Sequence, residues 1–162
     1  MKAIRTTHDG GIILDGTSNS LKGKDKTHDG YGGNDYWVVK LDAMGEQMWQ
    51  QTFGGNGQDD LEPIALTRDG GYVLAGSSNS SPLRDDKGQN IKKDKSQGNM
   101  DYWIIRLDAS GKELWQKSFG GKYADQLRSI AVTKDGGFIV GGYSNSPASA
   151  GFLQNMASTT DP

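Results

Sequence analysis

Two polar segments, residues 22–35 and 84–101, hold most of the side chains that could bind an ion. Calcium binding needs several oxygen ligands at short spacing around a glycine turn. The side chains of this type are Asp25, Asp29, Asn34 and Asp35 in the first segment and Asp94, Asn99 and Asp101 in the second. The spacing differs between the segments, matches no EF-hand, and is interleaved with lysines that would repel the ion. The sequence therefore predicts no cofactor, with calcium as the open alternative.

The same segments supply the candidate contacts for a protein or glycan ligand. The full set is Asp25, Lys26, Asp29, Tyr31, Asp35, Asp94, Lys95, Asp101 and Tyr123. Tyr31 and Tyr123 are the candidates for exposed aromatic residues outside predicted strands, where a ring can stack on a sugar. Other aromatics fall at repeated positions inside predicted strands, so we interpret them as packing residues: Tyr36, Trp37, Trp49, Tyr102, Trp103 and Trp115.

No arrangement typical of catalysis is found. Asp9, Asp69 and Asp135 each begin a DGG turn, so they are spread along the chain rather than paired, and Asx-turn hydrogen bonding explains them. Asp59 and Asp125 recur between units and are interpreted as structural carboxylates. The chain has no GxSxG, HExxH or P-loop motif. The charged residues that do not repeat resemble no catalytic set: Arg84, Asp85, Asp86 and the run 92–95.

A metal centre is not expected either. Zinc needs three or four converging ligands, and the chain has two histidines, His8 and His28, and no cysteine. Both histidines stand in Thr-His-Asp-Gly and are interpreted as turn residues. We therefore predict a protein that is not an enzyme and has no catalytic, cofactor-binding or metal-binding residues.

The elements that position these residues follow from a repeat. Residues 35–80 and 101–146 align without a gap at an offset of 66, with 24 of 46 positions identical. A partial third copy, IRTTHDGGIILDGTSNS, begins at Ile4. The copies differ in length only between SNS and DYW, which marks that segment as a surface loop. The repeated order of aromatics and turns excludes a disordered chain.

Each unit is expected to form four antiparallel strands. The second unit predicts strands at 64–67, 72–77, 101–107 and 113–119. Asp-Gly turns favour tight hairpins, and the glycine of LDASG suits the left-handed position of a bulged hairpin. Repeated four-stranded units are typical of β-propeller blades. The predicted fold is all-β, with β-propeller-like four-stranded blades, about two and a half of them, as a partial or open propeller.

Composition agrees with this fold. The chain has 162 residues, suited to one ordinary domain, and 24 glycines, which are costly in helices and common in turns. Its 18 basic and 20 acidic residues give a net charge of −2, which provides no electrostatic basis for binding nucleic acid or an anionic membrane. No apolar run is long enough to span a membrane.

The motifs resemble a particular family of repeats. The strings DYW-[VI]-[VI]-[KR]-LDA-x-G-x-x-x-WQ-x-x-FGG and IA-x-T-x-DGG-[YF]-x-x-x-G-x-SNS are similar to the propeller-like repeats of large secreted proteins in bacteria with type IX secretion. KDKT at 24–27 and KDKS at 93–96 partly match a loop element of that family. The resemblance covers about residues 4–146. It implies an extracellular or cell-surface setting and no shared catalytic residues.

The predicted organisation is a blade-like unit at 1–55, a second at 56–121, the first half of a third at 122–146, and a flexible non-repeat tail at 147–162. Two and a half blades cannot close a ring of at least four, so we expect a fragment of a longer propeller or a ring completed by several chains, with self-association through open sheet edges. The first residues, MKAIRTTHDGG, lack the apolar core of a signal peptide, so we expect none in this sequence. The predicted function is a non-catalytic scaffold or a protein- or ligand-binding module. The alternatives are a carbohydrate-binding module completed by oligomerisation and a fragment of a propeller enzyme that degrades polysaccharides.

Overall fold

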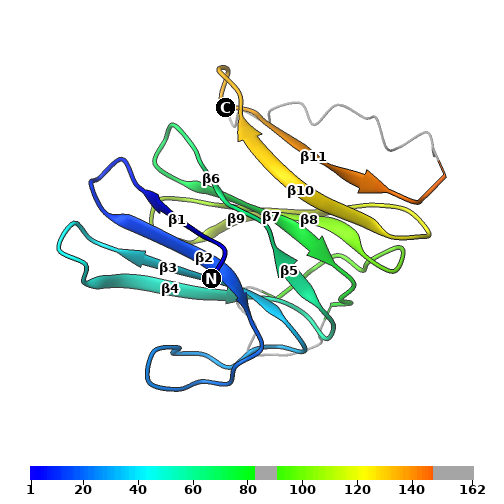
Figure 1. The fold of residues 1–162 in the computed structure, drawn as a ribbon, viewed down its shortest axis with the longest axis horizontal. Coiled ribbons are helices and arrows are strands. Elements are labelled where there is room, and N and C mark those ends of the chain that lie inside the picture. Colours follow the sequence, from blue (N-terminus) through cyan, green and yellow to red (C-terminus); the bar gives the residue numbers. More distant parts are fainter. Residues whose placement is uncertain (83–90, 148–162) are drawn as a thin grey trace.

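The computed structural model describes residues 1–82 and 91–147, which form eleven β-strands in three antiparallel sheets (Figure 1). No helix occurs in these residues, so they contain no helix that could cross a membrane. The three sheets use residues 3–53, 59–119 and 125–144 in turn, so each sheet is built from one continuous part of the chain.

The first sheet is an antiparallel meander in the order β1-β2-β3-β4. Its strands are β1 (Ala3–Thr6), β2 (Ile12–Ser18), β3 (Asp35–Leu41) and β4 (Gln47–Phe53). The β3–β4 turn has a register shift at Lys40/Leu41 and a positive φ of 88° at Gly45. The β8–β9 turn repeats both features at Arg106/Leu107 and Gly111, so the predicted glycine bulge is confirmed.

The second sheet contains β5 (Asp59–Leu61), β6 (Ala65–Leu66), β7 (Tyr72–Ser78), β8 (Asp101–Leu107) and β9 (Glu113–Phe119). The order is β5-β7-β8-β9, and β6 also pairs with β7. The strand predicted at 64–67 is present as β6, but it is shorter than predicted and covers only Ala65–Leu66.

Two short strands replace the single first strand because Glu62 and Pro63 interrupt it, and proline has no N–H to donate to the ladder. The predictions at 101–107 and 113–119 are confirmed, and β7 is one residue longer than the predicted 72–77.

A β-hairpin follows, made of β10 (Asp125–Val132) and β11 (Phe138–Ser144). Arg128 and Ser129 stand here where the second unit has Glu62 and Pro63. Because neither is proline, β10 runs through with only a register shift between Leu127 and Ser129. Residues 148–162 lie outside the described part of the chain, so the prediction of a flexible tail falls outside it too.

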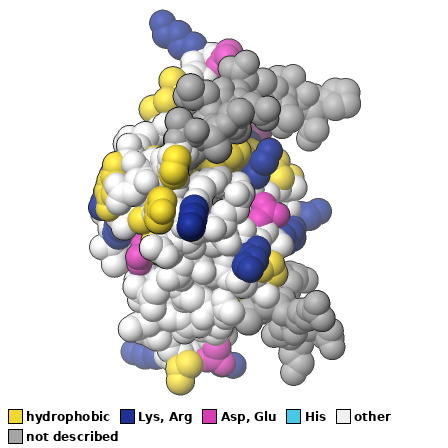
Figure 2. Space-filling view, turned by 90° about the vertical axis from the view of Figure 1, so that its right-hand side faces the viewer, with side chains coloured by type: hydrophobic (Ala, Val, Ile, Leu, Met, Phe, Trp, Pro, Cys, Tyr) yellow, Lys and Arg dark blue, Asp and Glu magenta, His cyan; other side chains and the backbone are white. Residues whose placement is uncertain are grey.

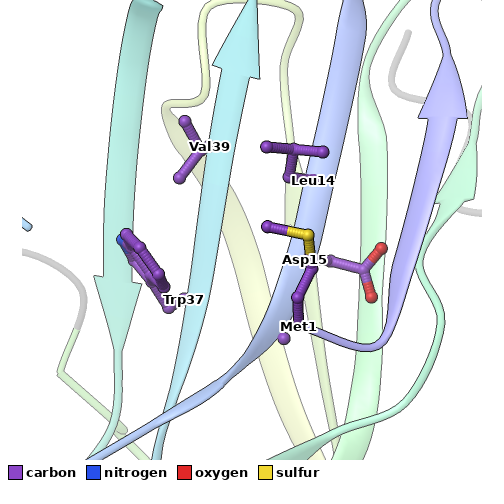
Figure 3. A pocket seen from close by; sticks show the side chains of 6 residues that line it. Met1, Leu14, Asp15, Trp37 and Val39 are labelled. Atoms are coloured by element: carbon purple, nitrogen blue, oxygen red, sulfur yellow. The ribbon is translucent and has the colours of Figure 1, made fainter. Parts of the chain in front are cut away.

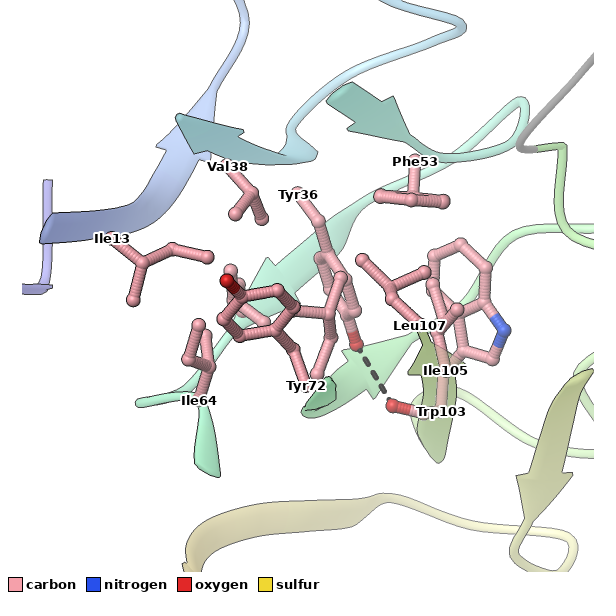
Figure 4. Close-up of a cluster of buried hydrophobic side chains, with 11 residues drawn as sticks. Ile13, Tyr36, Val38, Phe53, Ile64, Tyr72, Trp103, Ile105 and Leu107 are labelled. Atoms are coloured by element: carbon pink, nitrogen blue, oxygen red, sulfur yellow. Dashed lines mark hydrogen bonds between the residues drawn. The ribbon is translucent and has the colours of Figure 1, made fainter. Parts of the chain in front are cut away.

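The sheets stack through two hydrophobic clusters. The first lies between the first and second sheets and contains Ile13, Tyr36, Val38, Phe53, Leu61, Ile64, Tyr72, Leu74, Trp103, Ile105 and Leu107 (Figure 4). The second lies between the second sheet and the hairpin and is centred on Val73, Ala75, Tyr102, Ile104 and Leu127. Alternate residues of β7 and β8 therefore enter opposite clusters, as the apolar runs of these strands predict.

The coarse fold prediction is confirmed: the chain is all-β, antiparallel and partly four-stranded. The stack is open, and the sheets do not close into a ring in the described residues.

Candidate binding loops

The two polar segments occupy the same place in their sheets. The first joins β2 to β3 and the second joins β7 to β8, so both emerge at the end of the sheet opposite the DGG and LDAxG turns. Arg84, Asp85 and Asp86 lie outside the described residues, and the second loop is described from Ile91 onward.

A glutamine on the last strand of each sheet, β4 in the first and β9 in the second, anchors the loop of that sheet. Gln50 accepts a hydrogen bond from the Thr27 amide at 3.1 Å and donates to the Asp25 carbonyl at 3.0 Å. Gln116 makes the same two contacts with the Lys93 amide, at 2.9 Å, and the Ile91 carbonyl, at 2.8 Å. The contacted residues of the two loops are 66 residues apart in the sequence, so the loops are equivalent in space at an offset of 66.

This offset corrects the sequence comparison of the loops. KDKT at 24–27 and KDKS at 93–96 are 69 residues apart and are not equivalent in space. The equivalent lysines are Lys26 and Lys92, a pair that the sequence analysis missed. Extending the gapless alignment upstream from DYW would have found it.

Both equivalent lysines are buried. Lys26, a predicted ligand contact, is 4% exposed and donates from Nζ to the Ser20 carbonyl at 2.8 Å. Lys92 is fully buried and donates to the Asp94 carbonyl at 2.5 Å and to Ser118 Oγ at 2.9 Å. Burial lowers the pKa of both amines. Each lysine therefore holds its loop closed from inside.

Asp35 and Asp101, also predicted as ligand contacts, are fully buried at the starts of β3 and β8. Asp35 Oδ2 accepts from the Tyr31 amide at 2.9 Å, and Asp101 Oδ2 accepts from the amides of Gln97 and Gly98. Oδ1 of each has no hydrogen-bond partner among the described residues. Burial raises the pKa of Asp35 to about 6 and raises that of Asp101. A ligand can reach these carboxylates only if the loop opens.

Asp59 and Asp125 hold the connections between sheets. Asp59 Oδ2 accepts from the Gly55 amide at 2.9 Å and from Ser80 Oγ at 2.7 Å. Asp125 Oδ2 accepts from the Gly121 amide at 2.7 Å and from Ser146 Oγ at 2.9 Å. These contacts agree with the interpretation of structural carboxylates.

The remaining predicted contacts lie at the loop surface. Asp25, Asp29, Asp94 and Lys95 are exposed; Asp29 Oδ1 accepts from the Lys22 amide at 2.7 Å and Asp94 Oδ2 from the Ser118 amide at 3.3 Å. The site predicted from the sequence thus divides into buried groups that shape the loops and exposed groups that a ligand can contact.

The two candidate stacking aromatics differ in exposure. Tyr31 is half-buried, and its amide bonds to Asp35. Tyr123 is 44% exposed, with Lys122 Nζ 5.7 Å from its ring centroid. Tyr123 is therefore the better placed of the two to stack on a sugar.

The turn aspartates lie in three separate hairpins. Asp9, Asp69 and Asp135 each accept from a threonine hydroxyl and from the second glycine amide of DGG, as the Asx-turn interpretation predicts. His28 Nδ1 lies 2.8 Å from Thr27 Oγ1 in its own turn. Within residues 1–82 and 91–147, no three His, Cys, Asp or Glu side chains converge as metal ligands.

An apolar depression lies on the outer face of the first sheet. Met1, Leu14, Trp37 and Val39 line this shallow depression, which is open to solvent. Figure 3 shows the Asp15 side chain pointing to the opposite face of β2. The depression offers apolar contact and no paired polar groups.

No protein-family model matches the chain, and no curated protein matches it.

Proposed function

We propose that the chain is a non-catalytic part of a β-propeller-like repeat array in a secreted or cell-surface bacterial protein, and that it acts as a scaffold presenting binding loops. One observation carries the proposal: the same inter-sheet contact occurs twice. Tyr36 Oη reaches across to the second sheet, close to Gly76 and 3.1 Å from the Trp103 carbonyl. Tyr102 Oη lies close to Gly142 of the hairpin in the same way, 66 residues further on. Sheets that stack by one repeated contact are typical of modular repeat arrays.

The loops support the binding role. Their buried parts are anchored identically by Gln50 and Gln116, whereas their exposed residues differ between the two copies, as Asp29 and Lys95 do. A constant frame with variable exposed residues is typical of a surface that has been adapted for recognition. The extracellular setting rests on the resemblance of the DYW and SNS motifs to type IX secreted repeats.

Glycan binding is the second candidate. Tyr123 supports it, because its ring is 44% exposed outside the strands and a cation lies beside it.

The experiment is binding of the full chain to a glycan array and to a peptide array. The test variant carries Asp29→Ala and Lys95→Ala, and the control carries Arg68→Ala and Lys112→Ala, exposed charges at the opposite end of the strands. We expect at least tenfold weaker binding for the loop variant and no change for the control. Equal binding by both variants would contradict recognition through the loops. A third variant, Tyr123→Ala, tests the glycan candidate, which a loss of binding confined to this variant would favour. Release of sugar from any polysaccharide would contradict a non-catalytic role.

A further inference from the structure

The second strand of the hairpin has one open edge. β2 pairs with β3 and β7 pairs with β8 over seven consecutive positions, from Tyr72↔Leu107 to Ser78↔Asp101 in the second sheet. Among the described residues, β11 pairs only with β10. One edge of β11 (Phe138–Ser144) therefore has no pairing strand among the described residues, and its backbone N–H and C=O groups are unpaired there. It is the edge at which β7, the equivalent strand, pairs with β8.

The neighbouring face of the second sheet is only partly covered. Phe53 of β4 is fully buried by the second sheet, whereas its counterpart Phe119 of β9 is half-buried. The hairpin packs on β7 and β8 through β10, and it meets β9 where the Trp115 ring stacks on Phe138 of β11 with the ring centroids 6.0 Å apart. On the outer side of β11, Ile139 is 64% exposed, whereas its counterpart Val73 is fully buried. Figure 2 shows several hydrophobic side chains exposed in the upper half of the face that it presents.

A charge is also left without its counterpart. Asp9 pairs with Lys40 of β3 at 2.9 Å, and Asp69 pairs with Arg106 of β8 at 2.5 Å. Asp135 occupies the same turn position, accepts from Thr133 and Gly137, and makes no ion pair within the described residues. In the other two sheets this cation comes from the strand that follows the DGG hairpin, as Lys40 of β3 and Arg106 of β8.

We infer that β11 and the uncovered part of β8 and β9 form a docking site for a two-stranded hairpin of the type that forms β3–β4 and β8–β9, supplied by another polypeptide. The inference rests on the proposed repeat array and names its partner. The two complete copies define the register: the partner's DYW aspartate lies opposite Ser144, its LD leucine opposite Phe138, and its Lys or Arg reaches Asp135.

The test is titration of the full chain with a labelled synthetic peptide of residues 101–119, DYWIIRLDASGKELWQKSF, followed by fluorescence anisotropy. A scrambled peptide of the same composition is the control. We expect saturable binding, at least tenfold tighter than for the scrambled peptide, and slower amide hydrogen exchange in β11 with no change in β7. Main-chain pairing gives such strand addition its affinity, and the side-chain positions give it register.

Paired variants test the charge. Asp135→Asn removes the proposed partner of the peptide arginine and should weaken binding about twofold to fivefold, as expected for an exposed ion pair. Asp69→Asn is the matched control and should leave peptide affinity unchanged, because Asp69 already pairs within the chain.

Two results would overturn the inference. One is peptide binding no tighter than that of the scrambled control. The other is slow exchange of β11 amides in the free chain, as slow as in β7, because the chain itself would then cover the edge. Loop-dependent binding on the arrays, retained while the peptide fails to bind, would reject this docking site and leave the proposed function intact.

Discussion

The two interfaces between sheets are built from nearly the same residues but differ in how completely they exclude water. Tyr36 and Phe53, on the face that meets the second sheet, are fully buried. Tyr102, at the next interface, is 7% exposed, and Phe119 is half-buried. The five-stranded second sheet closes the first interface, whereas the two-stranded hairpin leaves the second interface partly open. The burial of a repeated side chain is therefore decided by the sheet beside it, and not by its own sequence.

The largest test of this comparison uses two tryptophans at one repeat position. Trp103 is fully buried in the first interface with its ring 4.8 Å from that of Tyr36, whereas Trp37 lies half-buried on the outer face of the first sheet. Each donates from Nε1 to its glutamine at 3.1 Å, so the pair differs mainly in stacking. We expect Trp103→Ala to lower the free energy of unfolding by about 3–5 kcal/mol and Trp37→Ala by about 1 kcal/mol.

Urea unfolding followed by circular dichroism measures both changes. Because Trp103→Ala removes a large share of a small domain's stability, Trp103→Phe and Trp37→Phe provide a milder pair with the same expected order. Equal losses at the two positions would mean that something covers the outer face of the first sheet as fully as the second sheet covers the inner one.

The second test adds a methyl group at each interface. A Cβ at Gly76 would meet the Asp60 carbonyl and lie 2.6 Å from Tyr36 Oη, and a Cβ at Gly142 would meet the Gln126 carbonyl and lie 2.6 Å from Tyr102 Oη. We expect Gly76→Ala to cost about 3 kcal/mol, because the sheets on both sides are held in place. Gly142→Ala should cost less, about 2 kcal/mol, because the hairpin can shift away from Tyr102 Oη but not from its own Gln126 carbonyl. Urea unfolding of both variants checks this, and equal costs would show that the hairpin is held as firmly as a full sheet.

The sequence predicted the regular part of this fold well. Alternation and turn chemistry located β7, β8 and β9 to within a residue, because DGG and LDAxG need glycine at positive φ at defined positions. The break at Pro63 was missed because an apolar IALT run predicts a strand whether or not the ladder continues before it.

The candidate site was predicted less well. Asp35, Asp101 and Lys26 have side chains typical of ligand contacts, yet tertiary contacts bury them. Composition cannot distinguish a charged group on a loop surface from one that the loop folds over, since the difference depends on hydrogen bonds from other strands. Lys92 was recognisable only through its equivalence with Lys26, which the shared KDK motif obscured.

The third test concerns a charge that only the first interface contains. Asp15 is 1% exposed, neither of its carboxylate oxygens has a hydrogen-bond partner among the described residues, and the equivalent residue in the second sheet is Ala75. Burial raises the pKa of Asp15 from 3.8 to about 6. The folded state therefore binds more protons than the unfolded state between these values, so the free energy of unfolding falls as pH rises from about 4 to about 6.

Asp15→Asn removes this titration while keeping the size of the side chain. We expect the variant to be more stable than the unmodified protein at pH 7.5 by about 2 kcal/mol, with the difference shrinking toward pH 4. Asp35, whose pKa is also raised to about 6, contributes the same slope to both proteins and cancels in the comparison. Urea unfolding at a series of pH values measures the difference, and a constant offset at all pH values would assign the effect to packing instead of charge.

The smallest expected effect separates the complete turns from the incomplete one. Asp69 and Asp135 accept the same threonine and glycine hydrogen bonds, but only Asp69 also meets a cation, Arg106. Thr67 and then the Gly71 amide and Arg106 lower the pKa of Asp69, so its contribution to stability is present at neutral pH and is lost as pH falls below about 4. Because its side chain is 64% exposed, Asp69→Asn should lower the free energy of unfolding by only about 0.5 kcal/mol, and Asp135→Asn should lower it by less.

Adding the 101–119 peptide should make these two losses of stability equal, because the peptide's arginine then gives Asp135 the cation that Asp69 already has. Thermal unfolding at low salt, with and without the peptide, measures both costs, and a gap that the peptide leaves unchanged would mean that the third turn does not depend on a third strand.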